Sequence, residues 1–259
     1  MDIPVKKSER CLAILEILQK QHKVSVNELA QRFGISEMTV RRDLNSLACQ
    51  YNISRTHGGA ELGNQPVVRM ISFDESRIAH KDAKEKIAAL AATMIRNGQR
   101  IFVDAGSTTR IMLNYLDEET RAVVVVNHLK VAEQALQFAN LSVIMLGGDM
   151  IRITNCSSGP VAEEQLKKYP LDIAFIGAAA IGTDGKLYDG SSPEARLKSS
   201  IFSVAQKIYV LADSSKINTY DLNEFGSLSQ IDGLITDSGI DEEGMLLMKR
   251  HRVNVMVAE

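Results

Sequence analysis

Seven short apolar segments rich in β-branched residues recur after residue 100, and helical patterns separate most of them. These segments are Ile101–Val103, Ala122–Val126, Val143–Leu146, Ile173–Ile176, Ile208–Leu211, Leu234–Ile235 and Val253–Val257. Strands that alternate with helices form parallel βαβ units, because a crossover helix is needed to start each new parallel strand. The pattern therefore predicts an α/β fold with an open, mainly parallel sheet and helices on both faces.

Residues 1–60 lack this alternation and indicate three short helices followed by a hairpin. The helices are expected over 8–21, 26–33 and 36–50. Ser25 and Ser36 are suited to cap the second and third helices, and Gly34 to end the second. In the third helix Met38 or Val40 is expected to face inward. Gly58 and Gly59 suit a tight hairpin turn.

The length of 259 residues leaves room for one small and one large domain. We expect a winged helix-turn-helix over 1–60, a linker over 61–74 and an α/β domain over 75–259 that begins with a helix at 75–97. The linker contains Gly63 and Pro66 and shows no periodicity.

Charge is divided unevenly between these parts. Residues 1–60 hold nine Lys and Arg against six Asp and Glu, a net charge of +3, whereas the rest hold 21 against 26, a net charge of −5. A basic module favours contact with phosphates, although a small excess of charge is also typical of an ordinary solvated surface.

Several classes of protein do not fit the composition. No apolar stretch approaches the roughly 18 residues that span a bilayer, so a cytoplasmic protein is expected. Cys11, Cys49 and Cys156 lie far apart and lack metal-ligand spacing, which favours reduced, mostly buried thiols. We expect no metal and no cofactor.

The third helix carries the candidate DNA contacts. Arg41 and Arg42 can reach phosphates or guanine edges, while Thr39 and Ser36 allow close approach to the duplex. Arg55 and His57 on the wing can reach the adjacent backbone or minor groove. The alternative is a three-helix packing module whose arginines pair with Glu37 or Asp43.

The loop after the first predicted strand is a candidate anion site. It reads Asp104-Ala105-Gly106-Ser107-Thr108-Thr109 and leads into a helix, so glycine, hydroxyls and helix dipole all favour a phosphate or carboxylate. Ser107 and Thr108 could instead serve only as helix caps.

Polar residues follow other predicted strands, and the carboxyl ends of parallel strands converge on one crevice. These candidates are Asn127, Gly147, Gly148, Arg152, Gly177, Asp213, Ser215 and Lys216. Arg152 and Lys216 would supply positive charge for a phosphate. Glu194 and Lys198 are further ligand candidates, with an ordinary i,i+4 ion pair as the alternative.

The N-terminal part resembles the DNA-binding region of the DeoR family of sugar-metabolism repressors. The matching residues are Arg10, Ile14, Leu18, Ser36, Thr39, Val40, Arg41, Arg42, Asp43 and Leu44, and separately the wing Arg55-Thr56-His57-Gly58-Gly59-Ala60. The segment Tyr51-Asn52-Ile53 departs from the glycine that the family often has before the wing.

The rest is similar to the DeoR-family C-terminal domain, which resembles ribose-5-phosphate isomerase in fold. The matches are Asp104 to Thr109, Asn127, Gly147-Gly148 with Arg152, Gly159-Pro160, Glu194 with Lys198, and Asp213-Ser214-Ser215-Lys216. The resemblance implies that a phosphorylated sugar or related metabolite binds there and releases the repressor from DNA. A departure is Gly177-Ala178-Ala179-Ala180, which lacks the family's polar residue. The next acidic residue, Asp184, is expected in a Thr-Asp-Gly turn.

Two hypotheses follow. The first is a non-enzymatic repressor of a carbohydrate operon, a homodimer or homotetramer that binds operator DNA and a phosphorylated sugar or polyol. The second is a sugar-phosphate isomerase-like enzyme with a DNA-binding appendage. The sequence shows no Walker lysine motif and no nucleophile-His-acid pattern, which favours the first.

Overall fold

The chain divides into two compact units, Met1–Met70 and Ile71–Glu259. This computed structural model describes residues 10–11, 13–14, 17–18, 21, 23–48, 53–56, 58–62, 80–152 and 154–259. Each unit has its own buried apolar core, so each is described separately below.

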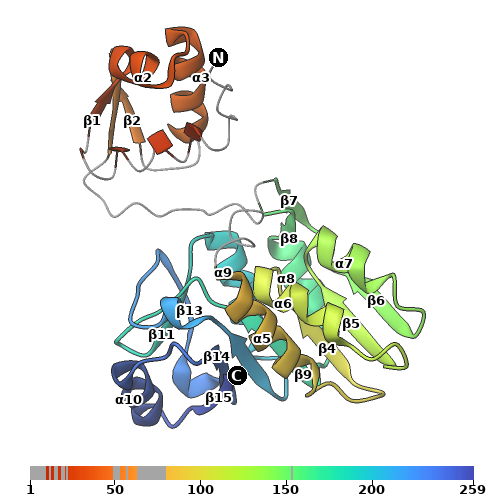
Figure 1. Cartoon of the computed structure of the whole chain (residues 1–259). Helices are drawn as coiled ribbons and strands as arrows, with labels where there is room; N and C mark the ends of the chain where they lie inside the picture. Colours follow the sequence, from red (N-terminus) through yellow and green to blue (C-terminus); the bar gives the residue numbers. More distant parts are fainter. Residues whose placement is uncertain are drawn as a thin grey trace. The chain divides into compact units, whose positions relative to one another are not determined.

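The first unit contains helices packed on a small antiparallel sheet (Figure 1). The described residues from 10 to 21 are helical. The following elements are β1 (Lys23–Ser25), α2 (Val26–Phe33), α3 (Glu37–Ala48), β2 (Ile53–Thr56) and β3 (Gly59–Leu62). The second and third helices are thus present as predicted. The expected ends at Ser8 and Gln50 lie outside the described residues.

Helix α2 has the ends that its sequence predicts. Ser25 Oγ accepts a hydrogen bond from the Glu28 N–H at 3.1 Å, and Glu28 Oε2 accepts one from the Ser25 N–H at 3.3 Å. Gly34 ends the helix with a φ of 63°, a left-handed conformation that glycine adopts without steric cost.

Strand β1 was not predicted, and it explains one of the wing glycines. The sheet order is β1-β3-β2, with Val24 opposite Ala60 and Ser25 opposite Gly59. A Cβ on Gly59 would lie 1.9 Å from the Val24 carbonyl oxygen, so only glycine fits. Because β3 runs through Leu62, the first two residues of the predicted linker belong to this sheet.

The second unit is built on a seven-stranded sheet in which every pairing is parallel. Its order is β15-β14-β12-β9-β4-β5-β6. The strands are β4 (Arg100–Val103), β5 (Ala122–Val126), β6 (Leu141–Met145), β9 (Ile173–Gly177), β12 (Ile208–Leu211), β14 (Gly233–Asp237) and β15 (Asn254–Ala258). The predicted α/β fold is confirmed, and each of the seven apolar segments overlaps one of these strands, with Leu146 and Val253 outside the strand bounds.

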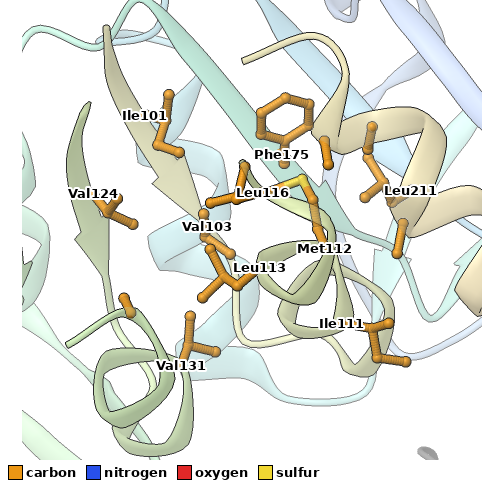
Figure 2. Packing of buried hydrophobic residues seen from close by; sticks show 14 of the residues in the cluster. Ile101, Val103, Ile111, Met112, Leu113, Leu116, Val124, Val131, Phe175 and Leu211 are labelled. Atoms are coloured by element: carbon orange, nitrogen blue, oxygen red, sulfur yellow. The ribbon is translucent and has the colours of Figure 1, made fainter. Parts of the chain in front are cut away.

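Helices cover both faces of the sheet. One core joins the strands to α5 (Lys81–Ala92), α6 (Ser107–Met112) and α7 (Leu129–Ala135), and the other joins them to α8 (Pro160–Leu166), α9 (Ser192–Ile201) and α10 (Glu242–Arg250). In β4, Ile101 and Val103 face the first core and Phe102 the second, as the period of two requires. Figure 2 shows Val103 beside Leu113 and Leu116, which follow α6, in the same cluster as Ile101 and Phe175.

Shorter strands and turns complete this unit and were not predicted. They are β7 (Asp149–Ile151), β8 (Cys156–Ser158), β10 (Ala180–Ile181), β11 (Lys186–Asp189), β13 (Asn223–Ser227) and the 3-10 helices Leu113–Tyr115, Ser214–Lys216 and Leu228–Gln230. β7 pairs with β8, and β10, β11 and β13 form a second sheet. Their two to five residues mix polar and apolar types, so they carry little periodic signal.

Helix α5 ends earlier than predicted. It stops at Ala92, and the amide groups of Thr93, Met94 and Ile95 bond to carbonyls three residues back, as in a tight turn. The expected start near Glu75 lies outside the described residues. Cys156 is buried and Cys11 half-buried, neither of them in a disulfide, and Cys49 lies outside the described residues.

Candidate DNA-binding and effector sites

Helix α3 presents an exposed stripe of side chains opposite its buried face. Val40, Leu44 and Leu47 are buried, so Val40 rather than Met38 fills the inward position. Met38, Arg42 and Asn45, spaced at i, i+4 and i+7, are exposed on the outward side. Met38 is 63% exposed. Sequence reasoning named Arg42 but missed Met38 and Asn45, although their helical spacing was readable.

The other predicted contacts on α3 flank this stripe. Arg41 lies 3.5 Å from Glu37 Oε2, and both side chains are largely exposed, so this pair leaves Arg41 accessible. Ser36 Oγ accepts a hydrogen bond from the Thr39 N–H at 3.3 Å and lies 2.9 Å from Thr39 Oγ1. Ser36 therefore caps the helix while remaining exposed at its start.

A buried ion pair fixes α3 to the first described helical segment of the chain, which contains Arg10. Arg10 Nε donates to Asp43 Oδ2 at 2.7 Å, and both side chains are buried. The sequence motif included both residues, but their pairing was not predicted because they are 33 positions apart. Arg55 lies in β2, whereas its side chain and His57 fall outside the described part of the chain.

In the second unit the strand order reverses between β4 and β9. From β4 the chain moves outward to β5 and β6, then returns to place β9 on the other side of β4. Ligands in open α/β sheets bind at the carboxyl ends of strands at such a reversal. Asp104 directly follows β4, and Gly177 ends β9.

A buried lysine ties this reversal together. Lys198 Nζ lies 3.0 Å from Asp104 Oδ2 and donates to Asp189 Oδ2 at 2.7 Å and to the Gly177 carbonyl at 2.8 Å. Asp104 Oδ2 also accepts from the Gly177 N–H at 2.9 Å. Burial disfavours the charged lysine, but the two carboxylates outweigh it and raise the pKa of Lys198 above its ordinary value.

Glu194 lies one helical turn before Lys198 and has its own partner. Its Oε1 accepts a hydrogen bond from Thr154 Oγ1 at 2.7 Å. Burial and the nearby Asp189 carboxylate raise the pKa of Glu194. The contacts of Glu194 and Lys198 thus reach Thr154, Asp104 and Asp189, which makes them part of a wider network than an i,i+4 pair.

The loop from Asp104 to Thr109 is held in one shape by its own hydrogen bonds. Thr109 Oγ1 donates to the carbonyls of Asp104 at 2.7 Å and Gly106 at 2.8 Å, and the side chain is fully buried. Ser107 and Thr108 begin α6 and are also buried. Thr109 therefore shapes the loop, while Ser107 and Thr108 lie at the helix start that would face an anion.

Asn127 and His128 follow the neighbouring strand β5. Asn127 Nδ2 donates to the Ser157 carbonyl at 3.3 Å, but within the described residues no donor reaches its buried Oδ1. His128 Nδ1 accepts from the backbone N–H of Lys130 and Val131 and so caps α7. Burial, with help from the positive Arg110, lowers the pKa of His128 to about 4.

A second buried lysine was missed by the sequence reading. Lys84 on α5 is 3% exposed, and burial lowers its pKa while nearby Asp213 partly offsets that effect. Lys216 adds like charge beside it. Ser215 Oγ donates to Asp213 Oδ1. The sequence signal for it was a single lysine on the side of α5 where the helical pattern predicts buried residues.

Several residues singled out in the sequence make no described contact with Lys198, with Lys84 or with the partners of these two lysines. Gly147 N–H donates to Gln165 Oε1 at 2.7 Å, and a Cβ on Gly148 would lie 2.4 Å from the Ser158 carbonyl oxygen. Arg152 is exposed in the turn after β7. Asp184 accepts hydrogen bonds from Lys186 N–H and Tyr188 Oη, so it holds the turn before β11.

Two family models match the chain. The DeoR-like helix-turn-helix domain matches residues 10–65, and the DeoR C terminal sensor domain matches residues 79–238. The chain belongs to the DeoR family. Its second unit is therefore the sensor domain, and the two-part organisation agrees with the matched ranges.

Curated DeoR-type relatives match along nearly the whole chain. An uncharacterized HTH-type transcriptional regulator, YulB of Bacillus subtilis, is 31% identical and covers 96% of this chain and 95% of its own. The glycerol-3-phosphate regulon repressor of Escherichia coli is 29% identical and covers 97% and 99%. The putative aga operon transcriptional repressor of Escherichia coli O157:H7 is 30% identical and covers 96% and 93%.

Solved structures with partial similarity include ribose 5-phosphate isomerase A from Methanocaldococcus jannaschii, with a TM-score of 0.41, 21% identity and coverage of 54% of this chain and 55% of the other. The translation initiation factor eIF-2B of Pyrococcus horikoshii has a TM-score of 0.45, 16% identity and coverage of 89% and 82%.

In the described part of the DeoR-family chain, no helix has the length and apolar character needed to cross a membrane.

Proposed function

We propose that the protein is a transcriptional repressor of a carbohydrate-utilisation operon that a phosphorylated sugar or polyol releases from operator DNA. The outward stripe Met38, Arg42 and Asn45 on a DeoR-like helix-turn-helix carries this proposal. The names of the relatives, among them a glycerol-3-phosphate regulon repressor, support the choice of repressor and of phosphorylated effector. They also favour a regulator over an enzyme.

The stripe matches the chemistry of the major groove. A forked guanidinium such as Arg42 suits the O6 and N7 of guanine, and an amide such as Asn45 suits the N6 and N7 of adenine. The apolar Met38 side chain suits a thymine methyl group. Arg41, Thr39 and Ser36 lie beside the stripe, where phosphate contacts would set the position of the helix. Two half-sites read by at least a dimer would supply the affinity.

The DNA test begins by selecting bound duplexes from a random library and measuring their affinity at fixed salt. We expect Arg42→Ala to lower affinity for the selected site by about 1–3 kcal/mol while changing nonspecific binding little. Arg32→Ala, at an exposed position on α2, is the matched control. Equal affinities for selected and unrelated duplexes in the unchanged protein would refute sequence-specific binding.

Met38 has a test that combines a change in the DNA with a change in the side chain. Replacing each thymine of the selected site by deoxyuridine removes one methyl group and leaves pairing intact. At one thymine, the replacement is expected to weaken DNA binding by the unchanged protein but not by the Met38→Ala variant. If the base change and the side-chain change weaken binding independently and additively, Met38 has another role.

The effector is proposed to bind at the carboxyl ends of β4, β5 and β12. Lys84 and Lys216 would neutralise a phosphate, Ser107 and Thr108 would donate to it, and Asn127 Oδ1 would accept from a ligand hydroxyl. Effector binding would lower the affinity of the DNA-binding domains for the operator through a coupling free energy of about 1–3 kcal/mol. The roles of Gly147, Gly148 and Arg152 as further contacts stay predictions.

The effector test is a thermal-shift screen against phosphorylated sugars and polyols, followed by operator release. A bound compound should raise the melting temperature, and Lys216→Met should reduce that rise while the exposed-site change Lys168→Met does not. Stabilisation by unphosphorylated sugars alone would contradict the proposed effector class. Conversion of the compound to a product would favour the isomerase-like alternative.

A further inference from the structure

The seven-stranded sheet has an edge that lacks the usual protection against pairing. Strand β15 is outermost, and β14 is its one neighbour among the described strands. Its residues Asn-Val-Met-Val-Ala include no charge and no proline. Edge strands of monomeric proteins usually carry charges, prolines or bulges, because their free N–H and C=O groups otherwise pair with another chain.

An apolar groove runs beside this edge. A hollow of about 780 Å³ lies between α10 and β15, and its apolar lining includes Met245, Leu246, Val253 and Val255. Leu246 is 48% exposed and Val257, on the strand, is 38% exposed. Large apolar side chains that line an open groove, next to a strand with no described partner on its outer side, favour a protein partner.

The charges on α10 indicate which partner fits. Glu242 and Glu243 lie exposed at the start of the helix, and Lys249 and Arg250 lie exposed at its end. If a second α10 ran in the opposite direction, the basic end of each helix would lie beside the acidic end of the other. This self-complementarity is what a two-fold interface between identical chains requires.

We infer that two copies of this protein associate through β15 and α10. The two β15 strands pair antiparallel and join the sheets into one, while the α10 helices lie antiparallel on the same face. Met245 and Leu246 of each copy fill the groove of the other, and the helix charges set the direction. This inference does not depend on DNA binding or on the effector.

The first test measures the mass of the full chain by analytical ultracentrifugation. Val257→Lys places a charge on the edge strand at an exposed position, so the fold should persist by circular dichroism while the assembly mass falls to half. Glu118→Lys, at an exposed loop position, is the matched control and should leave the mass unchanged. A monomeric unchanged protein, or a Val257→Lys protein of unchanged mass, would overturn the inference.

The second test exchanges the helix charges. One variant carries Glu242→Lys and Glu243→Lys, and the other carries Lys249→Glu and Arg250→Glu. In each variant alone, like charges would meet at the interface. The dissociation constant of its assembly should therefore be at least tenfold higher than that of the unchanged protein. An equimolar mixture should recover the assembly as mixed dimers. Failure of the mixture to associate more tightly than either variant would also overturn the inference.

Discussion

At the scale of single residues, Lys198 stands out because it is a buried cation shared by two carboxylates and a backbone carbonyl. A charge can remain in the interior when partners satisfy it, and removing one partner leaves the other charges uncompensated. Lys198 therefore holds β4, β9 and α9 in their mutual arrangement before any ligand arrives.

Replacing Lys198 tests this structural role. Lys198→Met leaves Asp104 and Asp189 buried without their shared cation, so we expect the free energy of unfolding to fall by about 3–5 kcal/mol. Chemical denaturation followed by circular dichroism measures it. Lys168→Met, at an exposed position, should change the stability by less than about 0.5 kcal/mol. A loss of similar size in both variants would contradict the role assigned to Lys198.

His128 predicts a particular pH dependence. Its pKa is lowered to about 4 in the folded protein, so the unfolded chain binds a proton first as the pH falls from about 6.5 to about 4. Stability contributed by neutral His128 is thus present above pH 6.5 and is lost through that window, by at most about 3 kcal/mol.

The variant His128→Asn isolates this effect, because asparagine can still cap α7 but does not titrate. Denaturation midpoints between pH 8 and pH 4 should fall less steeply for this variant than for the unchanged protein. Parallel curves for the two proteins would show that folding does not lower the pKa of His128.

At the scale of elements, the wing depends on a close approach between two strands. A Cβ at Gly59 would collide with the Val24 carbonyl, whereas a Cβ at Gly58 would meet no described atom within 4 Å. Gly59→Ala should therefore separate β1 from β3 and destabilise the DNA-binding unit by about 1–3 kcal/mol, with weaker DNA binding. Gly58→Ala serves as the control in both denaturation and DNA-binding measurements. Equal behaviour of the two variants would refute the packing explanation.

The elements that could be predicted from sequence are those with a local, repeated signal. Seven apolar runs, the Ser25 cap and the Gly34 stop identify the sheet and the helix-turn-helix, because their causes lie within a few residues. Arg10 with Asp43 and Lys198 with Asp104 could not be paired in advance, since each contact joins distant segments. Lys84 was overlooked although it lies three and four residues before the buried Ile87 and Ala88 of α5, a spacing that the sequence shows.

At the scale of the whole molecule, the two units have separate cores and are expected to unfold separately. Differential scanning calorimetry should resolve two transitions, since the described buried residues of each unit form apolar clusters of their own. A phosphorylated effector at a hundred times its Kd should stabilise the sensor unit by about 2.7 kcal/mol, and operator DNA should act mainly on the other transition. A single transition shifted equally by both ligands would show one cooperative unit.

If the effector binds as proposed, the amide oxygen of Asn127, which no donor from the described residues reaches, sets a condition on what the sensor domain can accept. A buried acceptor without a donor is costly, so a molecule that brings a hydroxyl to it gains more than one that brings phosphate oxygens alone. Inorganic phosphate would have to turn its own P–OH toward this acceptor, whereas a phosphorylated polyol could reach it with a carbon-bound hydroxyl while its phosphate stays on the cationic groups. This hydrogen bond would then favour a phosphorylated polyol over free phosphate.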